Sequence, residues 1–415
     1  MAVELLLFDL DDTLLRTADL EQGFRGTQYA GRQAQDYVDR LRAAYNTREN
    51  RIVYPRRFLN SLRERYPDVQ LGVFTKAPKH YAQTLLSIAY PGFEWDVLVA
   101  YEDVRYTKPN GEGILLAMDE AGVDDPWAVW MVGDTKGDIQ AAYDAGCWAV
   151  LDRATWPNSR RREDWWALER MPDASIAQPS ELLPVLDAPQ DYLPIAERLQ
   201  VSDCAAIAHP AARFEKWNAF DLDGRVYPIH YLGRHFSREA QRRVNWHQVT
   251  HDIHAMKDLL VVPDYWIAAI RAFLKRLVGQ HPGLAFGGSL VVTVIPAKPT
   301  RIRRLEAMLE QLAESHRAGA IAGIARISFV PDLLRYREGV QSQHGGDGLN
   351  KQQRMENVRD HLEVVDGAGY RGVHVVVIDD VATTGASLVY ANKYLTEAGA
   401  SAVTCLSLTK AINTQ

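Results

Sequence analysis

Apolar runs with the composition of β-strands recur along this chain, and segments with helical periodicity separate them. This alternation is typical of α/β folds, in which helices connect parallel strands and cover the faces of the sheet. It occurs in two blocks and fades near Asp187, where prolines and acidic residues accumulate. The expected strands are residues 3–8, 70–75, 95–100, 128–133 and 148–152 in the first block, and 289–297, 373–380 and 402–408 in the second.

The length of the chain, 415 residues, exceeds what one hydrophobic core usually supports. We therefore expect an α/β fold with two doubly wound, Rossmann-like domains, residues 1–187 and 286–415. An α+β middle segment, residues 188–285, joins them, and it contains a predicted amphipathic helix over residues 263–283.

The composition is that of an ordinary globular protein, with 47% hydrophobic residues, 24% charged residues and a formal net charge of −6. Wholesale disorder is therefore not expected, and the negative charge disfavours a nucleic-acid partner. Cys147, Cys204 and Cys405 form no metal-binding or disulfide pattern, which favours a reducing compartment. The first twelve residues resemble neither a secretory signal nor a membrane span. We expect a cytoplasmic protein with no membrane partner, and leave a homodimer open.

The segment FDLDDT near the N-terminus ends an apolar run with carboxylates. A buried parallel strand would deliver Asp9 to the carboxyl edge of the sheet, where α/β proteins bind their ligands. Complementary residues follow later in the block: Thr75 ends a strand, and Lys108 precedes a helix. Asp134 and Asp138 lie in a strand-to-helix loop, and two carboxylates at this spacing suit a hard cation such as Mg²⁺.

These motifs, in this order, resemble those of the haloacid dehalogenase (HAD) superfamily of phosphatases over residues 1–187. The resemblance implies phosphomonoester hydrolysis through an aspartyl-phosphate, with Asp9 as nucleophile and Asp11 as general acid and base. Thr75 and Lys108 would hold the phosphoryl oxygens and oppose their charge. The ligands that the resemblance implies for a Mg²⁺ cofactor are Asp9, Asp11 through its backbone carbonyl, Asp134 and Asp138.

Residues 16–65 separate the first two expected strands and have a helical pattern. In the HAD superfamily such an insertion is a cap that selects the leaving group of the substrate. Within it, Arg25, Tyr29 and Arg32 either face a substrate or form a solvated helix surface.

The run VVVIDDVATTGAS, residues 375–387, is the most specific local motif of the chain. A β-branched strand ends at Asp379 and Asp380, and a turn of small residues then leads into a helix. Backbone N–H groups of such a turn, at a helix N-terminus, favour a phosphate. The two carboxylates cannot bind that phosphate, but they suit vicinal hydroxyl groups. The run therefore predicts a site for a ribose 5-phosphate.

This run resembles the loop of type I phosphoribosyltransferases, which bind 5-phosphoribosyl-1-diphosphate (PRPP). Its surroundings, residues 291–304, 333–358 and 397–411, are closest to the ComF-like branch. The resemblance implies that Asp379 and Asp380 hold the ribose hydroxyls, and that residues 342–348 form a mobile loop that closes over the site. It implies that the 5-phosphate is held by Thr383, Thr384, Gly385, Ala386 and Ser387, with Lys298 and Arg301 as candidates for the diphosphate.

The middle segment leaves alternatives open. In this fold an added hood recognises the acceptor base, and a hood would come from residues 205–283. His247, His251 and His254 share one face if helical. They bind a transition metal, line a base pocket or are ordinary surface residues.

A near copy of the first motif, FDLDG, occurs at residues 220–224. It has Arg225 where the first motif has a threonine, and none of the later partners follow it. Asp223–Gly224 is better explained as the turn of a β-hairpin, and Pro228 restricts the second arm to an edge strand.

The sequence thus predicts a bifunctional enzyme of nucleotide metabolism: a phosphatase (hydrolase) fused to a phosphoribosyltransferase with a nucleobase-like acceptor. Coupling of the two reactions would yield a dephosphorylated nucleoside. One alternative is a phosphatase regulated by a non-catalytic domain that senses PRPP or a nucleotide. Another is a phosphatase that acts on nucleic-acid ends, which the net charge disfavours.

Overall fold

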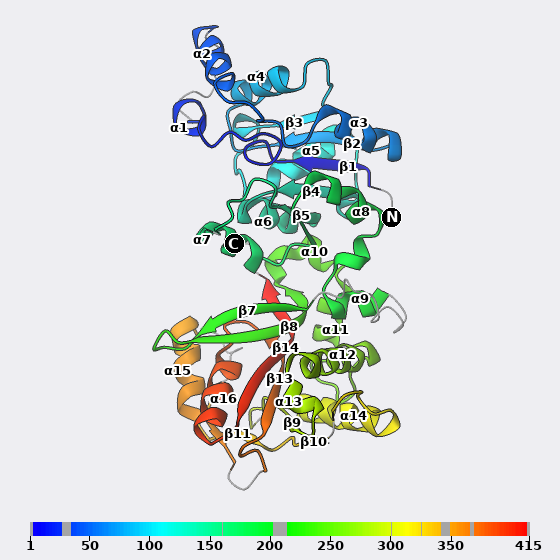
Figure 1. Ribbon diagram of the computed structural model, residues 1–415, viewed down its shortest axis with the longest axis vertical. Helices are drawn as coiled ribbons and strands as arrows, with labels where there is room; N and C mark the ends of the chain where they lie inside the picture. Colours follow the sequence, from blue (N-terminus) through cyan, green and yellow to red (C-terminus); the bar gives the residue numbers. More distant parts are fainter. Residues whose placement is uncertain are drawn as a thin grey trace. The chain divides into compact units, whose positions relative to one another are not determined.

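The computed structural model describes residues 3–26, 35–159, 161–201, 214–299, 301–324, 326–341, 349–365 and 369–412, leaving aside the side chains of Pro282 and Ala285. The chain divides into two compact units (Figure 1). The first consists of Met1–Tyr192, Phe236–His247 and Ile412–Gln415, and the second of Leu193–His235 and Gln248–Ala411. The middle segment 188–285 contributes to both units, and the domain boundaries expected from the sequence stay predictions.

The first unit is built on a six-stranded parallel sheet in the order β3-β2-β1-β4-β5-β6. Its strands are β1 (Leu5–Phe8), β2 (Gln70–Phe74), β3 (Val97–Val99), β4 (Val129–Gly133), β5 (Trp148–Asp152) and β6 (Ala174–Ile176). The five strands expected in this block are confirmed, and β6 is additional. The order reverses between β1 and β4, and such a switch point is where open α/β sheets bind ligands.

Helices connect these strands and bury the sheet. The helices of the unit are α1 (Glu21–Phe24), α2 (Gln35–Tyr45), α3 (Arg56–Arg65), α4 (Lys79–Ala89), α5 (Glu112–Ala121), α6 (Lys136–Ala145), α7 (Arg162–Glu169), α8 (Leu182–Asp187) and α10 (Gln241–Val244). All four residues of β1 are buried, which explains why this strand is a continuous apolar run. Helices α1 to α3 occupy the segment expected as a cap, in which Tyr29 and Arg32 lie outside the described residues.

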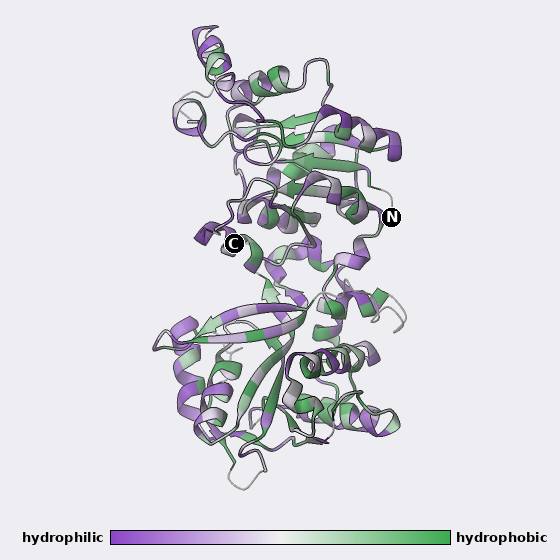
Figure 2. Cartoon of the chain, viewed as in Figure 1, coloured by the Kyte–Doolittle hydropathy of each residue, from purple (hydrophilic) through white to green (hydrophobic). Residues whose placement is uncertain are grey.

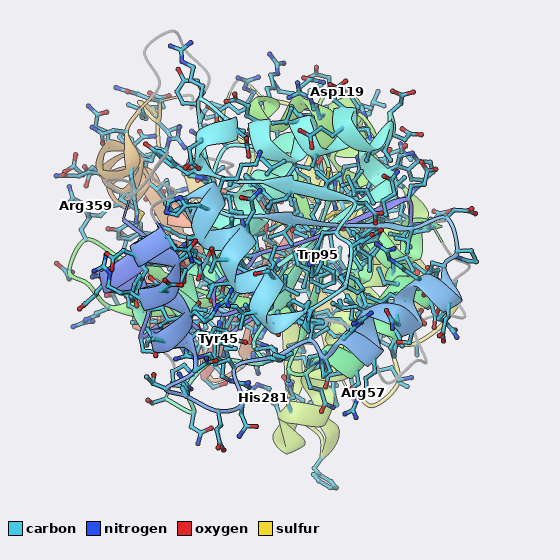
Figure 3. The ribbon with its side chains drawn as sticks, turned by 90° about the horizontal axis from the view of Figure 1, so that it is seen from above. Tyr45, Arg57, Trp95, Asp119, His281 and Arg359 are labelled. Atoms are coloured by element: carbon cyan, nitrogen blue, oxygen red, sulfur yellow. The ribbon has the colours of Figure 1, made fainter. Side chains whose placement is uncertain are left out.

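Hydrophobic residues concentrate in the strands, and hydrophilic residues line the outer turns of the helices (Figure 2). Charged side chains such as Asp119 and Arg359 project outward, whereas Trp95 lies among other side chains (Figure 3). The Trp95 ring packs with Phe8, Tyr90 and Phe93, at centroid distances of 6.4, 5.6 and 4.9 Å. This aromatic cluster holds the end of β1, and with it the residue that follows.

The second unit has a six-stranded mixed sheet in the order β10-β9-β13-β14-β8-β7. Its strands are β7 (Glu215–Phe220), β8 (Val226–Phe236), β9 (Ser289–Val294), β10 (Arg326–Phe329), β13 (His374–Ala382) and β14 (Ala402–Ile412), and β11 (Leu334–Tyr336) pairs separately with β12 (Leu362–Val364). Strands β10, β9, β13 and β14 are parallel, and β7 and β8 are antiparallel. The chain thus has a second unit, and its sheet is mixed because a hairpin of the middle segment extends it beyond β14.

Helices cover both faces of this sheet, and the alternation along β13 shows how. Val376 and Ile378 belong to the core formed with α12 and α14, whereas Val375 and Val377 belong to the core formed with α15 and α16. The helices of the unit are α9 (Ile195–Val201), α11 (Gln248–Ala255), α12 (Asp264–Gln280), α13 (Pro282–Ala285), α14 (Arg304–Ala318), α15 (Lys351–His361) and α16 (Ala386–Glu397). The amphipathic helix predicted over residues 263–283 is α12.

The FDLDG copy forms the hairpin turn that the sequence predicts. Asp221 Oδ1 accepts hydrogen bonds from the backbone N–H groups of Asp223 (3.0 Å) and Arg225 (2.8 Å), and Gly224 has φ of 78°. The expectation of an edge strand is wrong for β8, because β7 pairs along its outer side. Pro228 is exposed and lies close to the turn, where a missing N–H donor is tolerated.

Part of the middle segment packs into the first unit through Arg243. Its side chain is fully buried, forms an ion pair with Asp173, and donates to the Cys147 carbonyl at 2.8 Å. The guanidinium also stacks 3.8 Å from the ring centroid of Trp246. No helix within the described ranges is long and apolar enough to cross a membrane.

Replacement of Arg243 by alanine is expected to lower the free energy of unfolding of the first unit by about 3–5 kcal/mol, because it leaves the buried Asp173 carboxylate without its ion-pair partner. Urea unfolding followed by near-UV circular dichroism measures this. The control is Arg242→Ala, since Arg242 is exposed. Equal stability of the two variants would contradict the structural role of the pair.

Candidate functional site

Two clusters of polar residues stand out, one in each unit. The first lies at the carboxyl edge of the parallel sheet. Asp9 follows β1, Thr75 follows β2, and Asp134 follows β4, so neighbouring strands deliver all three to the switch point. The Asp9 N–H donates to the Val132 carbonyl at 2.8 Å, which continues the ladder between β1 and β4.

Lys108 connects two carboxylates of this cluster. Its Nζ lies 2.5 Å from Asp9 Oδ1 and 2.7 Å from Asp138 Oδ1, and all three side chains are buried. Asp138 Oδ2 accepts a further hydrogen bond from Thr135 Oγ1 at 2.6 Å. Asp134 accepts a weaker one from Thr13 Oγ1 at 3.3 Å, so the threonine of the first motif also faces the cluster.

Carboxylate oxygens of Asp9, Asp134 and Asp138 all lie within 4.8 Å of one another. Burial raises the pKa of Asp9 to about 7, against the lowering effect of Lys108, and burial raises the pKa of Asp134 well above its usual value. Burial acts in the same direction on Asp138, but Lys108 and Thr135 outweigh it and lower that pKa. The three buried carboxylates form an oxygen donor set that fits Mg²⁺.

Asp11 has a separate set of partners. Its Oδ1 accepts from Thr17 Oγ1 at 2.6 Å and from the Tyr81 hydroxyl at 2.9 Å. Its Oδ2 lies 3.1 Å from Arg25 Nε. Arg25 therefore faces the cluster rather than forming a solvated surface. Thr17 and Tyr81 belong to no motif that marks them as site residues in the sequence. Tyr81 has the pattern of an ordinary buried position in α4.

Thr75 is buried at the end of β2, and its Oγ1 accepts from the Ala77 N–H at 3.1 Å. The six residues predicted for the first site therefore lie at one edge of one sheet. Among these six residues, Lys108 forms ion pairs with Asp9 and Asp138.

Gly133 at the end of β4 lets Asp138 approach. A Cβ at this position would lie 2.3 Å from Asp138 Cγ, closer than any packing allows. Gly133→Ala is therefore expected to displace the Asp138 carboxylate and to lower the free energy of unfolding by about 1–3 kcal/mol. Chemical denaturation measures the change, and Gly23→Ala, whose Cβ would meet no atom within 4 Å, is the control. An unaltered stability of Gly133→Ala would mean that the site tolerates a different Asp138 position.

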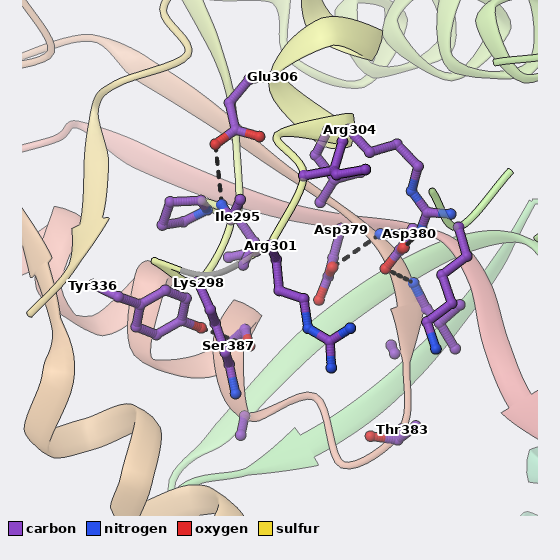
Figure 4. A pocket seen from close by; sticks show the side chains of 18 of the residues that line it. Ile295, Lys298, Arg301, Arg304, Glu306, Tyr336, Asp379, Asp380, Thr383 and Ser387 are labelled. Carbon is purple, nitrogen blue, oxygen red and sulfur yellow. Dashed lines mark hydrogen bonds and ion pairs between the residues drawn. The ribbon is translucent and has the colours of Figure 1, made fainter. Parts of the chain in front are cut away.

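The second cluster lines a cavity of about 260 Å³ in the second unit. One wall is formed by the end of β13 from Asp379 onward, the turn of residues 383–385 and the start of α16, and the turn between β9 and α14 forms another (Figure 4). All the residues predicted for this site line the cavity: Lys298, Arg301, Asp379, Asp380, Thr383, Thr384, Gly385, Ala386 and Ser387. Sequence analysis missed Lys257, Asp258, Arg304, Glu306 and Tyr336, which line it too.

Charged side chains from the two walls face each other. Lys298 and Arg301 extend toward the loop that carries Thr383 and Ser387, whereas Arg304 points to Asp380 and forms an ion pair with it (Figure 4). Burial raises the pKa of Asp379 to about 7, and Arg304 opposes that shift. Burial and then repulsion from Arg301 lower the pKa of Lys298.

The turn at Gly385 packs against the hairpin β7–β8. Gly385 has φ of 75°, and a Cβ there would lie 2.6 Å from Ile229 Cδ1 and 3.1 Å from the Trp217 ring. The hairpin β7–β8 therefore supports the turn at a distance that requires glycine. Ser387 Oγ lies 3.2 Å from the Tyr336 hydroxyl. The segment 342–348, predicted to close over the site, lies outside the described residues.

The three histidines do not form a metal site. Within the described ranges, the only group of three or more potential metal ligands is Asp9, Asp134 and Asp138. His247 precedes α11 and belongs to the first unit, whereas His251 and His254 lie on α11 in the second.

Comparison with known proteins identifies the family of the first unit. Residues 18–146 match the family model described as haloacid dehalogenase-like hydrolase, a segment that begins after Asp9 and Asp11. The N-terminal domain thus belongs to the HAD superfamily of hydrolases.

Parts of the chain are similar to individual known proteins. An N-acetylmuramic acid 6-phosphate phosphatase of Pseudomonas aeruginosa is 30% identical over 116 residues, 28% of this chain and 49% of the relative. A phosphoglycolate phosphatase of Escherichia coli K12 is 34% identical over 80 residues, 19% of this chain and 31% of the relative. The chain thus spans at most half the length of these relatives. The crystal structure of CbbY from Rhodobacter sphaeroides in complex with phosphate aligns with 45% of this chain and 99% of its own, at 19% identity and a TM-score of 0.35.

Proposed function

We propose that the first unit is a Mg²⁺-dependent phosphatase that acts through an aspartyl-phosphate on small phosphate monoesters. The observation that carries this proposal is the buried group of Asp9, Asp134 and Asp138, paired with Lys108 at the switch point. The curated relatives, which are phosphatases, support it.

In this proposal a carboxylate oxygen of Asp9 attacks phosphorus, and the bond from phosphorus to the leaving oxygen breaks. Asp11 gives that oxygen a proton and later takes one from the attacking water. Lys108 and Thr75 hold the phosphoryl oxygens, and Lys108 also reduces the repulsion between Asp9 and the incoming anion. Thr17, Tyr81 and Arg25 hold the Asp11 carboxylate in place.

A Mg²⁺ ion would supply charge neutralisation for the phosphoryl group. Its ligands would be Asp9, Asp134, Asp138 and the Asp11 backbone carbonyl. The first three already bring their oxygens within reach of one ion.

Asp9→Asn is expected to lower Mg²⁺-dependent hydrolysis of p-nitrophenyl phosphate by about a thousandfold or more, because an amide is a poor nucleophile. The matched control is Asp223→Asn in the FDLDG copy, whose side chain is 70% exposed and which should keep full activity. Activity that survives in Asp9→Asn would place the reaction elsewhere.

For the second unit we propose binding of PRPP and transfer of its phosphoribosyl group to a base-like acceptor. Support comes from the cavity, which brings Asp379 and Asp380 together with the Thr383–Ser387 turn and with Lys298 and Arg301. Carboxylates suit the ribose hydroxyls, the turn suits the 5-phosphate, and the two cations suit the diphosphate. Lys257 and Asp258 of the middle segment lie at the same cavity, as a hood drawn from that segment would require.

The two activities would form a sequence in the bifunctional enzyme. Transfer from PRPP yields a nucleoside 5′-phosphate, and the phosphatase converts it to a nucleoside, which draws a reversible transfer forward. The alternative is a PRPP- or nucleotide-sensing unit without catalysis that regulates the phosphatase.

PRPP, Mg²⁺ and a panel of nucleobases separate these possibilities. Wild type is expected to form a nucleoside, Asp9→Asn to accumulate the nucleotide, and Asp379→Asn to form neither, because the ribose hydroxyls lose a charged acceptor. Liquid chromatography with mass spectrometry measures the products. Binding of PRPP without any glycosidic product would favour the sensing unit, and a nucleoside formed by Asp9→Asn would contradict the coupling.

A further inference from the structure

Glu306 is a buried acidic residue at the cavity of the second unit. It lies in the first turn of α14, lines the cavity, and is only 5% exposed. It is not one of the residues proposed to contact PRPP. Carboxylates are seldom buried without a specific partner, so its contacts need an explanation.

Those contacts hold both ends of the turn between β9 and α14. Glu306 Oε1 accepts the backbone N–H of Ala297 at 3.0 Å and the Nε–H of Arg303 at 3.2 Å. Ala297 and Arg303 flank Lys298 and Arg301 in the sequence. Figure 4 shows Glu306 on one side of this turn, with Lys298 and Arg301 extending from it on the other. One oxygen atom therefore bridges the start and the end of the cationic segment.

The turn needs such a partner because its cations repel one another. Lys298 is partly desolvated, and Arg301 destabilises its charged form further, which lowers the pKa of Lys298. Arg304, at the start of α14, adds a third positive charge at the cavity, but its ion pair with Asp380 opposes that charge. A buried negative charge at Glu306 offsets this repulsion before any anion binds.

The two oxygens of Glu306 differ in their contacts. Oε2 is buried and has no hydrogen-bond partner among the described residues. A buried acceptor without a donor destabilises a fold. Glu306 thus holds the turn through one oxygen, while its other oxygen is buried without a donor from the described residues.

We propose that Glu306 is a positioning residue, which holds the turn so that Lys298 and Arg301 are presented to a diphosphate group. The inference rests on the proposed phosphoribosyl function. In it Glu306 touches no ligand, and it acts by ordering the turn in advance, which removes part of the entropic loss on binding.

Calorimetry on the full chain tests this with two probes in the presence of Mg²⁺, inorganic pyrophosphate and ribose 5-phosphate. Binding of pyrophosphate is expected to depend on the turn between β9 and α14. Binding of ribose 5-phosphate is expected to depend on Asp379, Asp380 and the Thr383–Ser387 segment. Glu306→Ala is expected to weaken pyrophosphate binding by about tenfold, the equivalent of one charge-assisted hydrogen bond, and to leave ribose 5-phosphate binding unchanged.

Two further variants complete the experiment. Glu306→Gln keeps an acceptor for the Ala297 N–H and should weaken pyrophosphate binding by only about threefold. Glu310→Ala, one turn further along α14 and exposed, should bind both probes as wild type does.

The outcomes are distinguishable. Equal loss of both probes in Glu306→Ala, or loss of neither, overturns the positioning role while leaving the proposed function intact. If Glu306→Ala does not fold, unchanged pyrophosphate binding by Glu306→Gln overturns it. A wild-type chain that binds neither probe contradicts the proposed function itself, and the positioning role falls with it.

Discussion

The repulsion between buried carboxylates is the constraint on which the first unit depends. Asp9, Asp134 and Asp138 lie within 4.8 Å of one another in a buried environment, and such an arrangement is unfavourable unless positive charge opposes it. Lys108 supplies part of that charge through its pairs with Asp9 and Asp138. Asp134 has no ion pair with Lys108, and burial, followed by repulsion from Asp138 and Asp9, raises its pKa. A divalent cation among the three oxygens would supply the remaining positive charge.

The fold stabilises this cluster because the residues follow neighbouring strands of one sheet, which cannot shift independently. The sheet places β1 between β2 and β4, and the ends of these strands carry Asp9, Thr75 and Asp134. Gly133 leaves room for Asp138, and the aromatic cluster around Phe8 and Trp95 holds the end of β1. Strain or repulsion at the site is therefore resisted by the packing of the whole sheet.

In the second unit the repulsion is between positive charges, and carboxylates oppose it. Here the turn after β9 gathers cations at a cavity, and the acids at the end of β13 and Glu306 oppose them. The turn of residues 383–385, which follows β13, is supported by a hairpin that packs against Gly385. That hairpin comes from the middle segment, so this segment is part of the structure of the site rather than a spacer.

Many of the strands, and the placement of the polar residues that follow them, were predictable from local sequence patterns. The apolar runs around Leu5–Phe8 and His374–Ala382 are strands, and the polar residues that follow each run lie at one sheet edge or in one cavity. The contacts of Asp11 with Tyr81, and of Arg243 with Asp173, were not predictable, because each joins residues far apart in the sequence without a local motif. The same holds for the hairpin β7–β8, which has a clear turn signal but no signal for the strand beside which it packs.

The central claim, that the carboxylate cluster of the first unit performs covalent phosphoryl transfer, is tested most directly by trapping the acyl phosphate. Protein turning over p-nitrophenyl phosphate with Mg²⁺ would be quenched in acid and reduced with borohydride, which converts an aspartyl-phosphate to homoserine. Peptide mass spectrometry would then identify the modified residue. The account predicts homoserine at position 9, and homoserine at any other aspartate, or a phosphoryl group on a different kind of side chain, would contradict it.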